Sequence, residues 1–375
     1  MKAKIDENKR TKLGKRASFI GIIVNVILAC GKMAVGIAFG LLSVLADGLN
    51  NLTDCGSSVI SVISFKLSSK PADEEHPYGH ERIEYVCSMV VAFIILVVAF
   101  ELIKESIGKI INPTESVFSY VIIGVLTASV LFKCALFLYY RAVAKKIDSQ
   151  ILKASSVDSL SDCVATTVVI ISVIVSKITE FNIDGYAGIL VSLFIAYSAF
   201  GILKEVFSML IGKAPEQDML KEIKEKILSY EGVLGVHDLS VYSYGPSKYF
   251  ASAHIEVDAN VDVLISHELV DAIEKDFIEN MGIILTGHLD PIVVDDERVN
   301  TLREKVENII SSIDCKFSIH DFRMVFGENR TNVLFDVAIP YDAKLSKAEI
   351  RKIIEDEIYK IDEKYCLVIT IEQCI

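Results

Sequence analysis

The sequence has 375 residues, of which 52% are hydrophobic and 23% are charged, and its mean hydropathy is +0.44. It is too apolar for an ordinary soluble enzyme of this size, so the composition indicates a membrane protein with a soluble part. The net charge is −12 and no basic, aromatic-rich face is present, so we expect no nucleic-acid partner.

Six apolar runs are long enough to cross, as helices, a hydrocarbon core about 30 Å thick. They lie at about residues 17–40, 42–66, 84–104, 117–141, 153–177 and 185–211. A basic tail, residues 1–16, precedes a first run that is too long for a signal peptide. Lys and Arg accumulate in this tail and in alternate loops, which predicts that both termini are cytoplasmic. We expect a multi-pass transmembrane domain over residues 17–212.

The apolar runs shorten after residue 212, and the pattern becomes helix, strand, strand, helix, strand. This order occurs in residues 213–297 and again in residues 298–375. The string "GVHDLSVYSYG" in the first stretch parallels "SIHDFRMVFG" in the second. Any two stretches with this order of elements look partly alike, but the shared His-Asp pair and Gly favour a duplicated α+β domain.

Polar side chains interrupt the second and fifth apolar runs at helical spacing. Residues three and four apart lie on one face of a helix, so Asn50 shares a face with Asp54, and Asp158 shares one with Asp162. Ionisable groups at membrane depth are costly and normally face a partner or a water-filled cavity. Two matched stripes predict one common site.

The spacing leaves alternatives open. Asp47 with Asn51 fits an i, i+4 pair equally well, and small polar side chains in spans often serve only as hydrogen-bonding groups between helices. Three carboxylates, however, repel one another unless a cation or protons balance them. Carboxylate and amide oxygens are hard ligands, which favours a cation such as Mn²⁺ over Zn²⁺. A divalent ion leaves one excess negative charge, so protons compete with the metal for the same oxygens.

The strings "LADGLNNLTD", "PADEEHPYGHERIE" and "SVDSLSD" resemble the cation diffusion facilitator family of metal/proton antiporters, over about residues 15–295. The resemblance implies a homodimer in which each chain has six transmembrane helices and a ferredoxin-like cytoplasmic domain. It assigns the transport site to Asn50, Asp54, Asp158 and Asp162. Zinc members of the family carry His at the position of Asp158, so this sequence is similar to the manganese-exporting branch.

The resemblance implies two further metal sites. One lies in the loop between the second and third spans, with ligands Asp73, His76 and His80. The other lies in the first cytoplasmic module, with ligands His237, His254, His267, His288 and Asp290. A charged loop such as the one between the second and third spans is more often an ordinary exposed turn than a metal site. In the first cytoplasmic module, His237 with Asp238 could equally be a structural hydrogen-bonded pair.

The second module retains fewer nitrogen donors than the first. His320 matches His237, while Asp336 and Glu372 fall near the places of His254 and His288. We expect this module to serve dimer packing or weak regulation.

The sequence therefore predicts a transporter, not an enzyme, that moves Mn²⁺ out of the cytoplasm in exchange for protons by alternating access. The metal is the substrate and no cofactor is expected; efflux of Zn²⁺, Fe²⁺ or Co²⁺ by the same fold is the alternative. Short loops and unpaired cysteines suit a bacterial inner membrane. Two other classes are an intramembrane aspartyl protease, whose G-x-G-D context is absent, and a membrane-anchored metal sensor, which a flux assay distinguishes.

Overall fold

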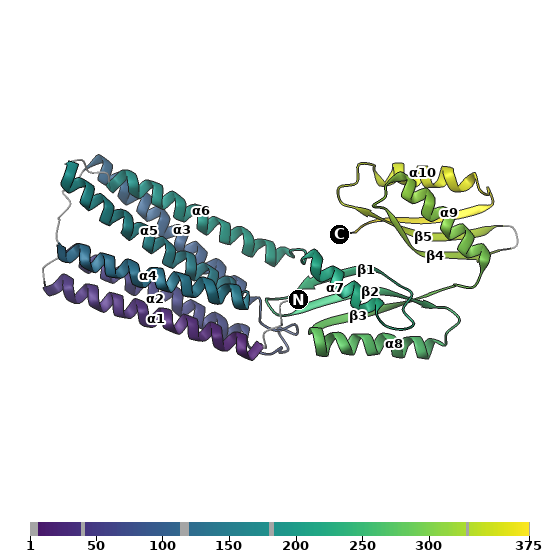
Figure 1. Ribbon diagram of the computed structural model, residues 1–375, viewed down its shortest axis with the longest axis horizontal. Helices are drawn as coiled ribbons and strands as arrows, with labels where there is room; N and C mark the ends of the chain where they lie inside the picture. The colour runs from purple at the N-terminus through teal and green to yellow at the C-terminus, as the bar shows by residue number, and fades with distance from the viewer. Residues whose placement is uncertain (1–6, 39–41, 113–119, 180–183, 328–329, 375) are drawn as a thin grey trace. The chain divides into compact units, whose positions relative to one another are not determined.

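The computed structural model describes residues 7–38, 42–112, 120–179, 184–327 and 330–374. The chain divides into two compact units. One comprises Met1–Lys213 and the turn Ser243–Lys248, and the other comprises Ala214–Tyr242 and Tyr249–Ile375. The first is helical, and the second combines helices with two small sheets (Figure 1).

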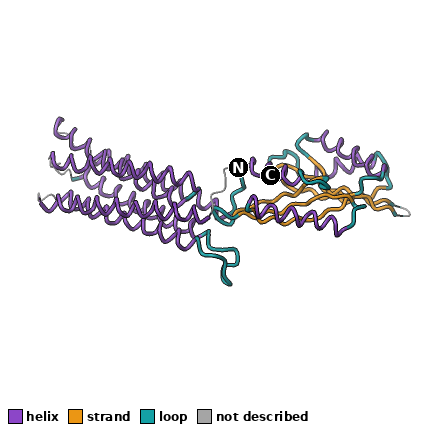
Figure 2. The backbone as a smooth tube through the Cα atoms, turned by 60° about the horizontal axis from the view of Figure 1, so that its bottom comes forward, coloured by secondary structure: helices purple, strands orange, loops and turns teal. Residues whose placement is uncertain are grey.

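Long helices that run side by side form the first unit (Figures 1 and 2). They are α1 (Glu7–Ala38), α2 (Leu42–Ser68), α3 (Ile83–Ile111), α4 (Tyr120–Ile147), α5 (Gln150–Thr179) and α6 (Asp184–Ile211). Each predicted run falls mainly within one of these helices. The helix α1 begins at Glu7, so it already includes most of the basic residues of the predicted tail, residues 1–16.

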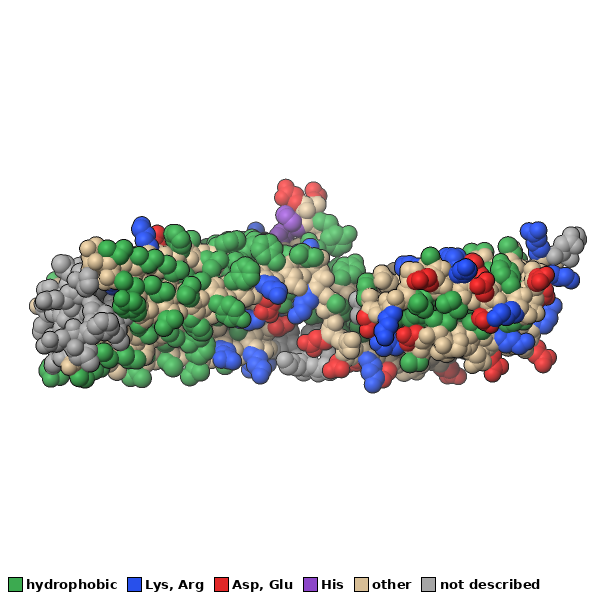
Figure 3. Space-filling view, turned by 90° about the horizontal axis from the view of Figure 1, so that it is seen from above, with side chains coloured by type: hydrophobic (Ala, Val, Ile, Leu, Met, Phe, Trp, Pro, Cys, Tyr) green, Lys and Arg blue, Asp and Glu red, His purple; other side chains and the backbone are tan. Residues whose placement is uncertain are grey.

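Large apolar side chains cover the outside of this bundle. Examples are Phe100, Leu190 and Tyr197, which are 66%, 72% and 80% exposed. Green hydrophobic side chains dominate the helical unit in Figure 3, whereas charged side chains are scattered over the α+β unit. Such a surface suits lipid rather than water. Five helices of the described part are long and apolar enough to span a membrane; α2 has 27 residues, but its first half contains side chains that lie outside the described set, so the sixth span stays a prediction.

Glycines of α6 allow a close approach to α3. A Cβ atom at Gly185 would lie 2.8 Å from the carbonyl oxygen of Ser106, and one at Gly188 would lie 2.2 Å from its hydroxyl oxygen. Small residues at such crossings are the usual means by which membrane helices pack, because van der Waals contact replaces the hydrophobic effect there. This pair of glycines therefore positions α6 on α3.

A buried ion pair joins the N-terminal parts of α1 and α3. Nη2 of Arg10 lies 2.7 Å from Oε2 of Glu84, and both side chains are buried. Ser149, just before α5, donates to Oε1 of Glu84 at 2.6 Å. Nε of Arg10 donates to the carbonyl oxygen of Ile147 at 3.0 Å, at the end of α4. This network connects α1, α3 and the junction of α4 with α5.

Arg10→Met is expected to destabilise the bundle by about 3 to 5 kcal/mol, because the substitution leaves the Glu84 carboxylate buried without its partner. Thermal unfolding of the purified protein in detergent measures the loss. The control is Lys104→Met, which removes a side chain that is 75% exposed and 4.0 Å from Glu101; it should change stability little. Equal melting temperatures for both variants would contradict a stabilising role for the buried pair.

The second unit contains two α+β modules with the same order of elements. The first has α7 (Gln217–Leu228), β1 (Gly235–Ser243), β2 (Tyr249–Asp258), α8 (Val263–Asp276), a short π-helical turn (Phe277–Met281) and β3 (Ile283–Ile292). The second has α9 (Glu297–Ile313), β4 (Ser318–Phe326), β5 (Thr331–Pro340), α10 (Lys347–Tyr359) and β6 (Tyr365–Cys374). Both modules therefore have the element order that the sequence indicates, while their origin by duplication stays a prediction.

Sheet topology repeats as well. The strand orders are β1-β2-β3 and β4-β5-β6, and in each sheet the last two strands are parallel. The residue after the first histidine has a left-handed backbone in both modules, with φ of 49° at Asp238 and 54° at Asp321. Aspartate tolerates this conformation better than most residues. The same local turn therefore presents His237 and His320.

Each module has its own hydrophobic core. In the second module, Ile350, Ile354 and Ile358 recur every fourth residue on α10 and are fully buried. A capping box fixes the start of this helix, because Ser346 accepts from the backbone N–H of Glu349 and the Glu349 side chain accepts from that of Ser346. The first module buries Ile223 and Ile227 of α7 in the same way. These helices support the sheets whose strands carry the His and Asp side chains.

Candidate functional site

The polar stripes of α2 and α5 meet inside the helical unit. Ser57 of α2 donates from its hydroxyl to Oδ2 of Asp158 on α5 at 3.0 Å. Asp54 and Asp162 extend the same two stripes and contact one common side chain of α4. The structure therefore joins Asp54 and Asp162 through one lysine and joins Asp158 to Ser57 of α2. These three acids are not among the groups of described residues whose ligand atoms all lie within 4.8 Å of one another, so their common metal site stays a prediction. The side chain of Asn50 lies outside the described ones, as does that of the competing Asp47.

Lys133 of α4 is the common partner of two of these acids. Its Nζ lies 2.8 Å from Oδ2 of Asp54 and 2.6 Å from Oδ2 of Asp162, and the residue is 3% exposed. The ammonium group therefore lies between acids from α2 and α5. A buried lysine is stable only with such partners, because an isolated charge at this depth is costly.

Sequence reasoning missed Lys133. Its only signal is a lone lysine within the apolar string "SVLFKCALF" of the fourth span, which alone does not show which residues it faces. The cysteine that follows Asp162 packs against α4. Cys163 is buried with its Sγ 3.7 Å from the carbonyl oxygen of Val130, and the metal-capable groups among the described residues contain no cysteine.

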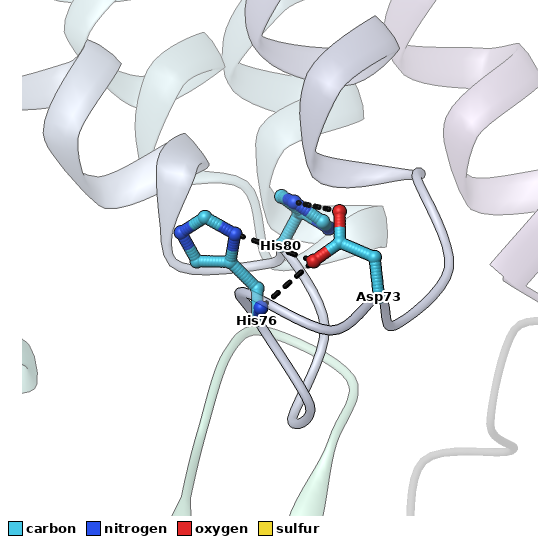
Figure 4. Close-up of side chains that lie close together, drawn as sticks. All are labelled: Asp73, His76 and His80. Atoms are coloured by element: carbon cyan, nitrogen blue, oxygen red, sulfur yellow. Dashed lines mark hydrogen bonds and ion pairs between the residues drawn. The ribbon is translucent and has the colours of Figure 1, made fainter.

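The loop between α2 and α3 brings Asp73, His76 and His80 together (Figure 4). Nδ1 of His76 lies 3.4 Å from Oδ1 of Asp73, and Nε2 of His80 lies 3.4 Å from Oδ2. The backbone N–H of His76 donates to Asp73 at 2.7 Å, and this hydrogen bond is the main reason that the pKa of Asp73 is lowered. All three predicted loop residues therefore converge.

His80 is oriented as a metal-binding histidine would be. Its Nδ1 lies 3.0 Å from the carbonyl oxygen of Pro71, which can only accept, so Nδ1 carries the proton. In the neutral ring the lone pair is then on Nε2, which faces Asp73. A backbone carbonyl that fixes the tautomer in this way is common around metal-bound histidines.

The first cytoplasmic module gathers a second group on one face of its sheet. Asp290 is at its centre: Oδ2 lies 3.1 Å from Nε2 of His237 and 2.8 Å from Nδ1 of His254, and Oδ1 lies 3.2 Å from Nε2 of His288. His254 and His288 are paired residues of β2 and β3. Alternate residues of a strand share a face, which places His288 and Asp290 together.

The structure differs from the predicted ligand set at two residues of this module: His267 lies apart from the group, and Glu256 lies beside it. His267 is exposed on α8 and joins none of the metal-capable groups among the described residues. Glu256, which was not predicted, is buried, with Oε1 3.9 Å from Nε2 of His237. Its signal was available, because Glu256 follows His254 by two residues in a strand and so lies on the same face.

The second module places His320, Asp336 and Glu372 together. Strand register refines the predicted match between the modules. Tyr249 pairs with Ile283, as Thr331 pairs with Tyr365. Asp336 follows Thr331 by as many residues as His254 follows Tyr249, so Asp336 occupies in β5 the position that His254 has in β2, as predicted. Glu372, however, occupies the place of Asp290, while Thr370 replaces His288.

Burial raises the pKa of Glu372 to about 7, and the nearby Asp238 carboxylate adds to the shift.

Comparisons with known proteins identify both units. The model of the cation efflux transmembrane domain matches residues 18–211, and that of the cation efflux protein cytoplasmic domain matches residues 215–292. An uncharacterised transporter of Methanocaldococcus jannaschii is 30% identical over 276 residues, which are 74% of this chain and 97% of the relative. The chain belongs to the cation efflux, or cation diffusion facilitator, family.

Two other members of the family have names that state what they transport or do. The manganese efflux system protein MneS of Bacillus subtilis is 27% identical over 282 residues, or 75% of this chain and 97% of MneS. The cation-efflux pump FieF of Salmonella choleraesuis is 27% identical over 284 residues, or 76% of this chain and 94% of FieF.

Family membership establishes the general activity. This cation diffusion facilitator is a divalent cation efflux transporter rather than an enzyme, a multi-pass membrane protein with a cytoplasmic C-terminal domain. The matched cytoplasmic domain is of a dimerising type. Both matched ranges end by residue 292, so the second module lies beyond them.

Proposed function

We propose that this chain is a Mn²⁺/H⁺ antiporter that exports manganese from the cytoplasm as a homodimer with six transmembrane helices in each chain. The observation that carries the proposal is that Asp54 and Asp162 share one partner, Lys133, while Asp158 accepts from Ser57 of the facing helix, so three carboxylates line the interface of α2, α4 and α5. An oxygen donor set favours a hard divalent cation. The similarity to MneS supports the same metal.

The transport site would consist of these carboxylates and Asn50, as the family resemblance implies. Lys133 changes the charge balance expected from the acids alone. Three carboxylates and one ammonium group carry a net charge of 1 − 3 = −2, which a divalent ion neutralises completely. In the metal-free state two protons would achieve the same neutrality, and charge at this depth is costly. We therefore expect two protons to exchange for each metal ion.

Lys133 would also replace the metal when the site is empty. Its ammonium group occupies the space between Asp54 and Asp162 that a bound cation would share. Metal entry would displace it toward Asp158, where its charge still counts within the site, and metal departure would let it return. The lysine thus lowers the cost of the empty site during the change from inward-facing to outward-facing forms.

The other two clusters would bind metal outside the membrane. The loop group, Asp73 with His76 and His80, would take up cations near the cytoplasmic entrance, where Glu74 and Glu75 add negative charge. The group around Asp290 would report cytoplasmic metal to the transport unit. Its nitrogen-rich donors suit softer ions such as Zn²⁺ or Fe²⁺ better than the transport site does.

Reconstitution in liposomes tests the proposal. A pH-sensitive dye and a metal-sensitive dye record both fluxes after Mn²⁺ or Zn²⁺ is added. Manganese-driven proton flux, with about two protons for each ion by the charge balance, is the expected result. Flux with Zn²⁺ alone would overturn the metal assignment, and the absence of flux with either ion would favour the metal-sensor alternative.

Asp158→His is expected to shift the preference toward Zn²⁺, because imidazole is a softer donor than carboxylate. The same assay gives the ratio of Zn²⁺ to Mn²⁺ flux, which should rise at least about tenfold, as one ligand exchange worth about 1.4 kcal/mol would produce. The control Asp158→Glu keeps the carboxylate and should keep the preference for Mn²⁺. Unchanged selectivity in the histidine variant would show that ligand hardness is not the filter.

A further inference from the structure

We propose that the second cytoplasmic module holds a divalent-cation site of its own, made by His320, Asp336 and Glu372. The three residues come from three neighbouring strands, β4, β5 and β6. His320 and Asp336 are paired residues, and Glu372 lies two residues beyond Thr370, the partner of Asp336, on the same face. One ligand atom from each lies within 4.8 Å of the others.

The buried imidazole of His320 points to a ligand. The residue is 6% exposed, and neither ring nitrogen makes a hydrogen bond within the described part of the chain. Nε2 lies 3.0 Å from Oε1 of Glu372, yet this contact lacks hydrogen-bond geometry, and that oxygen is also without a hydrogen bond to any described residue. Buried polar atoms normally have partners. A cation between these atoms would satisfy both.

The donor set indicates the class of cation. One imidazole nitrogen and two carboxylates form a harder set than the three imidazoles and one carboxylate of the first module. Asp238, in the same unit, adds a third carboxylate, with Oδ1 3.5 Å from Nε2 of His320. Three ionised carboxylates around one imidazole would repel one another unless a cation or protons balance them. Mn²⁺ or Fe²⁺ fits this mixture better than Zn²⁺ does.

The substitutions between the two modules support a metal-binding role for the second module rather than loss of metal binding there. Asp336 replaces His254, and Glu372 replaces Asp290, so both places keep a metal-capable side chain. A place that had lost its function would be free to carry an apolar or amide residue. The His320 ring also stacks on that of His237, with centroids 4.3 Å apart, so the two groups adjoin within the C-terminal unit.

Mn²⁺ binding to the full-length protein in detergent tests this site. The metal-free protein is dialysed against Mn²⁺, and bound ions are counted by electron paramagnetic resonance. The double variant Asp336→Asn with Glu372→Gln should bind one Mn²⁺ fewer per chain than the wild type. The matched control is Asp356→Asn with Glu363→Gln, which removes two exposed carboxylates of the same module and should keep the wild-type number. Equal numbers for both double variants would overturn the proposal.

A gain-of-function variant keeps the test valid if the double variant folds poorly. Thr370 is exposed and stands at the place of His288, so Thr370→His would supply a second imidazole to the site. Zn²⁺ affinity there should rise at least about tenfold, measured by competition with a zinc-sensitive dye. No change would contradict a metal site. Both measurements concern binding in the second module, so they can fail while the transport assay succeeds, and the reverse.

Discussion

Asp158→Ala should abolish manganese-driven proton flux in liposomes, as should Asp54→Ala and Asp162→Ala. Each substitution removes one of the three carboxylates that would bind the metal and exchange the protons. Loss of a partner that only orients a ligand typically costs about 10- to 100-fold, so loss of a ligand should lower flux at least about 100-fold. The ratio of initial rates of the pH-sensitive dye, normalised to protein in the liposomes, measures the effect.

Neighbouring serines provide graded controls for this experiment. Ser57 donates to Asp158 across the helix interface, so Ser57→Ala should lower flux by about tenfold. Ser161 is adjacent to Asp162 but donates to the carbonyl oxygen of Val157 in its own helix, so Ser161→Ala should leave flux near wild type. Normal flux in Asp158→Ala would remove α5 from the proposed transport site.

Lys133→Met should lower both transport and the stability of the metal-free protein. Without the ammonium group, Asp54 and Asp162 lose their buried counter-charge, which costs about 3 to 5 kcal/mol when one partner of a buried pair is removed. Mn²⁺ can supply the missing positive charge. Added Mn²⁺ should therefore raise the melting temperature more in the variant than in the wild type, whereas flux falls because the empty form is disfavoured.

Thermal unfolding in detergent, with and without Mn²⁺, measures the stability part, and the liposome assay measures flux. Lys104→Met is the control, since this lysine of α3 is 75% exposed and lies far in sequence from the site. A Lys133→Met protein with wild-type flux and melting temperature would show that the lysine neither balances the acids nor takes part in the cycle.

Helical periodicity predicted that the acids of α2 and α5 form two stripes, because residues that share a helix face are fixed by local geometry; their role in transport stays a prediction. The family resemblance pointed to Asp73, His76 and His80 in the loop string "PADEEHPYGH", and the structure brings these three side chains together within one short loop. Lys133 and Arg10 were missed for one reason. Each is explained by acids far along the chain, Asp54 for Lys133 and Glu84 for Arg10, and periodicity within one segment carries no information on such pairs.

Strand register limited the prediction in the cytoplasmic modules. Sequence similarity brought Asp336 to the right place but put Glu372 near the place of His288, whereas the parallel pairing of β5 with β6 puts Glu372 at that of Asp290. A shift of two residues along a strand keeps the face but changes the neighbour. Only the ladder of β5 and β6 determines which neighbour it is.

The repeat of the α+β module within one chain removes a restriction that symmetry imposes. When two identical subunits pair about a twofold axis, any substitution appears on both sides of the axis. Here the two copies are encoded separately, so one can carry His254 where the other carries Asp336. Because both copies belong to one chain, their local concentration is fixed by the linker and not by expression level. With the two metal sites proposed above, a tandem of this kind would respond to two different cations at once, which a symmetric pair of identical domains cannot do with one donor set.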